Sequence, residues 1–68
     1  MAQEFEVPAA NVMWDSDVDR WLILVDDGVI AGHAETKKEA IRRAKDLDGI
    51  TRVLAWTKNG SNFDTHRA

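Results

Sequence analysis

Residues 21–25 read WLILV, and this run of five apolar residues decides the fold. In an extended strand successive side chains point to opposite faces of the sheet. The first, third and fifth residues of the run therefore lie on one face, and Leu22 and Leu24 lie on the other. A strand that is apolar on both sides is typical of a sheet that is covered on both faces.

Turn signals on either side of this strand predict two β-hairpins. The sequence DDG at residues 26–28 favours a tight turn, because Asp-Gly tolerates positive φ angles, and VIAGHA at residues 29–34 is the returning strand. The first hairpin is therefore expected over residues 20–34. A second hairpin is expected over residues 50–66, where ITRVLAWT and NFDTH flank an Asn-Gly turn.

The segment between the hairpins predicts one helix over about residues 36–48. Thr36 and Glu39 have the spacing of a capping box, in which each side chain binds a free backbone N–H at the start of the helix. Gly49 suits the left-handed position that ends a helix. The apolar residues in between recur with the spacing of one buried stripe: Ala40, Ile41, Ala44 and Leu47.

These elements predict a single α+β domain over residues 1–68. We expect an antiparallel sheet of four to five strands with one helix packed on one face. Residues 1–14 are expected to form an N-terminal arm with short strands at 3–7 and 10–14. One helix covers only one face, so another chain or the N-terminal segment must cover the second. The apolar residues of that segment are Phe5, Val12, Met13 and Trp14.

The stretch from Trp21 to Asn62 resembles a small uncharacterised family of prokaryotic β-β-α-β domains. The shared pattern is a Trp-led strand, a hairpin, TKxEAIxxA and a strand ending in a Gly turn, read here as WLILV, DDG, TKKEAIRRA, VLAW and NG. The chain differs by an added N-terminal arm and a shorter link after the helix. It is similar, more weakly, to the N-terminal domain of HicB-type antitoxins, without their DNA-binding domain. The resemblance implies a non-catalytic module, often assembled through its sheet.

A protein interface is the first function that these patterns favour. A large apolar face on a small domain usually marks a contact with another protein or another copy. Trp14 is a candidate exposed anchor, because Trp is enriched among residues that dominate binding energy. The interface candidates are Trp14, Leu22, Leu24, Leu54 and Trp56.

The charge distribution supports a nucleic-acid contact as an alternative. Residues 1–35 hold eight acidic and one basic residue, a charge of −7, whereas residues 36–68 hold four acidic and eight basic residues, a charge of +4. The basic candidates lie on the predicted helix: Lys37, Lys38, Arg42, Arg43 and Lys45. A solvated helix face is favoured over this alternative, because Glu39 has the spacing to pair with Arg43 and Asp46 with Arg42, and the isoelectric point is about 5.2.

The third alternative is a phage-type inhibitor of a nucleoprotein complex, acting through an acidic face or through the basic helix. Carboxylates in a row imitate phosphates, as in phage proteins that inhibit nucleoprotein complexes. The candidates here are Asp15, Asp17, Asp19, Asp26 and Asp27. Four of them have an EF-hand-like spacing, but Arg20 stands where that loop requires Gly, so we expect no calcium site.

Other functions are disfavoured by what the sequence lacks. There is no Cys, and the two His residues make a weak case for a metal site. Nucleophile and phosphate-loop motifs are missing, so we expect no enzyme, no cofactor and no small-molecule substrate. No apolar run is long enough to span a bilayer and no secretory signal is visible, so we expect no membrane contact and a cytoplasmic location.

Overall fold

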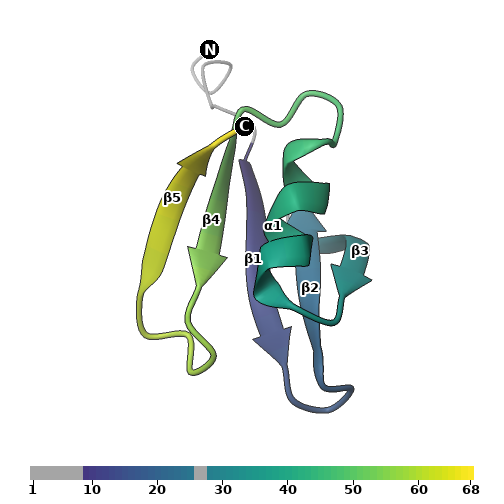
Figure 1. Ribbon diagram of the computed structural model, residues 1–68, viewed down its shortest axis with the longest axis vertical. Helices are drawn as coiled ribbons and strands as arrows, with labels where there is room; N and C mark the ends of the chain where they lie inside the picture. The colour runs from purple at the N-terminus through teal and green to yellow at the C-terminus, as the bar shows by residue number, and fades with distance from the viewer. Residues whose placement is uncertain (1–8, 26–27) are drawn as a thin grey trace.

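The fold is one five-stranded β-sheet that carries a single helix on one face (Figure 1). The computed structural model describes residues 9–25 and 28–68. The expected strand at residues 3–7, with Phe5, lies outside the described residues. The elements in chain order are β1 (Ala9–Asp15), β2 (Arg20–Val25), β3 (Val29–Ala34), α1 (Lys37–Lys45), β4 (Arg52–Trp56) and β5 (Phe63–Arg67). The predicted α+β class and both predicted hairpins are confirmed.

The strand order is β3-β2-β1-β4-β5, which places β1 at the centre of the sheet. The sheet is mixed rather than wholly antiparallel as expected, because β1 and β4 pair in parallel, with Ala9 beside Arg52 and Val12 beside Ala55. The other pairs are antiparallel. The helix explains the parallel pair, since α1 carries the chain back across the sheet and β4 therefore starts at the same end as β1. Figure 1 shows this crossing in front of β1 and β2.

Helix α1 begins where the sequence predicts and ends three residues earlier than predicted. The hydroxyl of Thr36 accepts a hydrogen bond from the backbone N–H of Glu39 at 3.2 Å, which is the predicted cap. The second half of the predicted capping box is replaced, because the Glu39 carboxylate accepts hydrogen bonds from arginine side chains instead. Asp46 caps the C-terminal end. A turn then reaches Gly49, whose φ of +80° is the expected left-handed conformation.

The core lies between α1 and the sheet and is built mainly from small residues. Ala40 and Ala44 of the helix are fully buried, and Ile41 and Leu47 pack against the core while half-buried. The buried sheet residues are Ala10, Val12, Trp21, Ile23, Ala34, Val53 and Ala55. Because alanine predominates at this contact, the helix backbone lies close to the sheet.

Candidate protein-binding face

The face of the sheet opposite α1, called the open face from here on, carries its own set of apolar side chains. The strand pairing places Met13 beside Leu22, and Asn11 between Leu24 and Leu54. These residues alternate along their strands with the residues that face the helix. The large apolar residues of the open face form one group, the apolar patch: Met13, Leu22, Leu24, Leu54 and Trp56.

The two-sided character predicted for WLILV is confirmed. Trp21 is 6% exposed and Ile23 is 2% exposed against the helix. Leu22 and Leu24 lie on the open face and are half-buried, although no described element lies over them. Their partial burial therefore comes from their neighbours within the sheet.

Trp56 is held in place on the open face by two contacts. Its indole Nε1 donates a hydrogen bond to Oδ1 of Asn11 at 2.9 Å, across the parallel β1–β4 pair. Its ring also lies 4.7 Å from the ring of Phe63, measured between centroids. Phe63 is its direct partner on β5. An aromatic ring fixed in this way offers a rigid apolar surface.

Three members of this face were not among the predicted interface residues, namely Met13, Phe63 and Ile30. Phe63 is 43% exposed and Ile30 is 59% exposed, and both extend the apolar patch toward the edge strands. The signal for Phe63 was present in the sequence, because an Asn-Gly hairpin fixes the register that places it opposite Trp56. The signal for Ile30 was hidden by a bulge: Gly32 pairs with Ile23 while Ile30 pairs with Leu24, so Ala31 is an extra residue.

Trp14 does not belong to this group. It pairs with Trp21 across the β1–β2 hairpin and therefore lies on the face that carries α1. The two rings meet edge to face at 5.3 Å, and the Lys58 ammonium lies 4.3 Å from the centroid of the Trp14 ring. Trp14 is half-buried and packs against the core on the α1 side, so it lies apart from the apolar patch, and its role as a binding anchor stays a prediction.

The described part of the N-terminal segment, from Ala9 onward, does not lie over the open face. Its residues from Ala9 onward form the central strand, with Val12 fully buried under the helix and Met13 on the open face. We expected these residues to cover the second face of the sheet. In the structure, successive residues of β1 lie on alternate faces instead. Among the described residues, nothing forms a second layer.

The cations of the predicted basic helix do not form one free row. Arg42 and Arg43 both donate to the Glu39 carboxylate, at 2.8 Å and 2.9 Å. These hydrogen bonds lower the pKa of Glu39, and the bond from Glu39 raises the pKa of Arg42. The predicted Glu39–Arg43 pair is confirmed, whereas Arg42 pairs with Glu39 instead of Asp46.

The helix lysines lie in two places, with Lys37 against the sheet and Lys38 and Lys45 around one hollow that Arg42 also lines. The Lys37 ammonium lies 5.3 Å from the centroid of the Trp21 ring, on the side of the sheet that carries α1. Arg43 also donates to the backbone carbonyl of His33 at 2.9 Å. Lys38 and Lys45 are exposed and line a shallow hollow beside His66.

The acidic candidates are also divided. Asp17 and Asp19 are exposed in the turn after β1, and Oδ1 of Asp15 accepts a hydrogen bond from the Asp17 backbone N–H at 2.9 Å. Asp26 and Asp27 lie outside the described residues. The structure therefore describes the acidic candidates only for Asp15, Asp17 and Asp19, at the end of β1 and in the turn that follows.

Comparison with protein-family models, curated proteins and solved structures finds no match to this chain. Among the described residues, no helix is long and apolar enough to cross a membrane. The same residues contain no group of three His, Cys, Asp or Glu side chains that could hold a metal ion. The apolar patch is thus the feature of the described residues on which a functional proposal can rest.

Proposed function

We propose that this protein is a small non-catalytic binding module whose contact surface is the open face. The observation that carries the proposal is the apolar patch, which no described element covers. The partner is a protein, either a second copy of this chain or a different one. The patch of Met13, Leu22, Leu24, Leu54 and Trp56 is the centre of the contact.

Burial of apolar area drives such a contact. Removing apolar surface from water contributes about 25 cal/mol per Å². The half-buried side chains of the patch have area left to bury, and Phe63 at 43% exposure and Ile30 at 59% exposure have more. Trp56 is already oriented by Asn11, so it loses little freedom on binding.

Charged residues lie around the patch and suit the polar rim of an interface. Arg20 lies at one end of the open face, where it contacts Nδ1 of His33 at 3.2 Å and the Glu35 carboxylate at 3.6 Å. Arg52 and Arg67 lie at the other end. The helix is the weaker candidate surface, since Arg42 and Arg43 are already engaged by Glu39.

The test is a double substitution in the patch, Leu22→Asp with Leu24→Asp. Light scattering over a range of concentrations gives the solution mass of wild type and variant, and capture from a lysate gives any heterologous partner. We expect the wild type to self-associate or to retain a partner, and the variant to lose that contact while its circular dichroism stays that of a folded protein.

Val18→Asp is the matched control, because Val18 is 57% exposed in the turn between β1 and β2, outside the patch. We expect it to behave as wild type. A folded double variant with the same mass and the same captured proteins as wild type would contradict the proposal.

A further inference from the structure

Two arginines face each other at one end of the open face. Arg52 of β4 is the direct partner of Arg67 of β5 in the antiparallel register. The backbone N–H of Ala68 donates to the carbonyl of Thr51 at 3.1 Å, so the Thr51–Ala68 pair is hydrogen-bonded and the next pair along is not. In such a pair the Cα atoms are about 4.5 Å apart, and the side chains are at their closest.

This arrangement is unfavourable unless an anion balances it. Like charges directly opposite each other destabilise a strand pair. Arg20, Arg42 and Arg43 each have a carboxylate within 4 Å, namely Glu35 or Glu39. Within residues 9–25 and 28–68, no such partner is found for Arg52 or Arg67.

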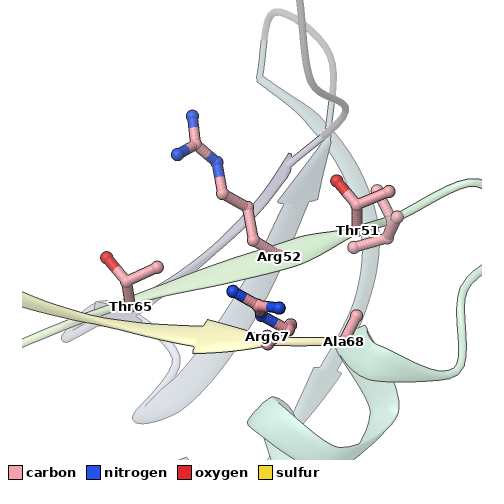
Figure 2. Close-up of a pocket in the computed structure, with 6 residues that line it drawn as sticks. Thr51, Arg52, Thr65, Arg67 and Ala68 are labelled. Atoms are coloured by element: carbon pink, nitrogen blue, oxygen red, sulfur yellow. The ribbon is translucent and has the colours of Figure 1, made fainter.

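The two arginines line a hollow at the edge of the sheet. Its volume is about 650 Å³. Figure 2 shows Arg52 and Arg67 extending from neighbouring strands, with Thr65 further along β5. Thr65 shares a face with Arg67, because they are two residues apart on one strand. The lining residues are Ile50, Thr51, Arg52, Thr65, Arg67 and Ala68.

We propose that Arg52 and Arg67 form an oxyanion site that binds a phosphate group. A guanidinium presents planar N–H donors that match phosphate oxygens in pairs. Two guanidinium groups supply two positive charges, which balance a phosphate dianion. The Thr65 hydroxyl adds a neutral donor beside them. This site goes beyond the protein contact proposed above.

The phosphate has two chemical sources, a free or small-molecule phosphate and the backbone of a nucleic-acid strand. The second source is suggested by the other end of the same hairpin, where Trp56 and Phe63 form an aromatic pair on the same face. This pair lies four positions along the strands from the arginines, about 13 Å at the usual rise. Single-stranded nucleic acid binds surfaces that combine stacking aromatics with cations in this way.

The first measurement is a titration of the whole chain with inorganic phosphate, followed by amide chemical shifts. Sodium chloride at equal ionic strength is the reference. We expect saturable shifts at Arg52, Thr65 and Arg67. In Arg52→Gln with Arg67→Gln, phosphate binding should weaken about tenfold or more, since charge-assisted hydrogen bonds are lost.

Lys38→Gln with Lys45→Gln is the matched control, because it removes the same charge from the helix, on the opposite face. This variant should bind phosphate as wild type does. The arginine variant should melt at the same temperature as wild type or higher without phosphate, because a like-charge repulsion is removed. Shifts equal to those in sodium chloride, or unchanged in the arginine variant, would overturn the proposal.

A second experiment distinguishes the two sources of the phosphate group. It measures the fluorescence anisotropy of a labelled single-stranded oligonucleotide. Binding that is lost in the arginine variant and in Phe63→Ala supports a nucleic-acid strand. Phosphate binding without oligonucleotide binding supports a small phosphate. The Leu22→Asp and Leu24→Asp variant should still bind phosphate, so failure of the protein contact and failure of the phosphate site give different results.

Discussion

The two faces of the sheet use different residues for different tasks. Under α1 the buried positions are mostly small, with Ala10, Val12 and Ala55 at or near zero exposure. On the open face the corresponding positions hold larger side chains, such as Leu24 and Trp56, and these are only half-buried. The domain thus places several large apolar side chains where its own described chain provides no cover.

This difference shows how packing a single helix on one face can stabilise the described sheet. Alanine at the helix contact lets two backbones approach and pack at high density. Close packing then stabilises one face, while the apolar area on the other has no cover among the described residues. A single strand, β2, supplies both kinds of surface in alternation.

Two adjacent residues of β2, one on each face of the sheet, give the largest expected effect on stability. Their substitution compares the two faces directly. Ile23→Ala should destabilise the fold by roughly 2–5 kcal/mol, because it leaves a cavity under the helix. Leu24→Ala should cost only about 1 kcal/mol, because this side chain is already half in water. Urea unfolding of the two variants measures both values.

The Ile23→Ala and Leu24→Ala variants also separate an effect on stability from an effect on binding. Ile23→Ala should leave any contact of the open face intact in the molecules that remain folded, whereas Leu24→Ala should weaken that contact. Equal losses of stability in the two variants would mean that the two faces are equivalent in the free protein.

Substitution of Asn11, on the open face, should have an intermediate effect on stability. Asn11→Ala removes the acceptor for the indole N–H of Trp56, which is partly buried, and should reduce stability by about 1 kcal/mol. Asn11→Asp keeps an acceptor oxygen and should recover most of this loss. Unfolding curves of the two variants, followed by tryptophan fluorescence, test whether the bond holds Trp56; identical curves would argue against it.

Substitution of Glu39, on helix α1, should have the smallest effect on stability. It serves as a reference outside both faces of the sheet. Arg42 and Arg43 lower its pKa, so the folded state favours the ionised carboxylate. Its contribution is therefore present above the ordinary pKa of about 4.5 and is lost as the pH falls through the lower pKa of the folded state.

Glu39→Gln should therefore be slightly less stable than wild type at neutral pH and equal to it in strong acid. Thermal melting across this pH range measures the difference, which added salt should reduce. A constant difference at every pH would show that charge is not its cause.

Local signals predicted most of the elements. The apolar run WLILV, the Thr36 cap and the Asn-Gly turn each act over a few residues, and each leads to an element that the structure contains. The interface candidates Leu22, Leu24, Leu54 and Trp56 share a face for the same reason, since the face of a strand residue follows from a period of two.

Long-range pairing could not be predicted in this way. The parallel contact of β1 with β4 joins segments separated by the helix and two strands, and no short motif encodes it. The face on which Trp14 lies was not assigned from the sequence either, because it follows from the register of β1 against β2. The arginine pair was missed because the predicted hairpin ended at residue 66, one residue before Arg67.

Because β1 is the central strand, the sheet can be completed only after the chain has made β4. During synthesis β1 can pair with β2 early, but its second edge stays unpaired until the chain has passed α1 and made β4. Distant pairings of this kind slow folding, and an unpaired strand edge invites pairing with another chain. A nascent chain that stops at the helix therefore exposes the backbone of the strand that the finished domain protects best.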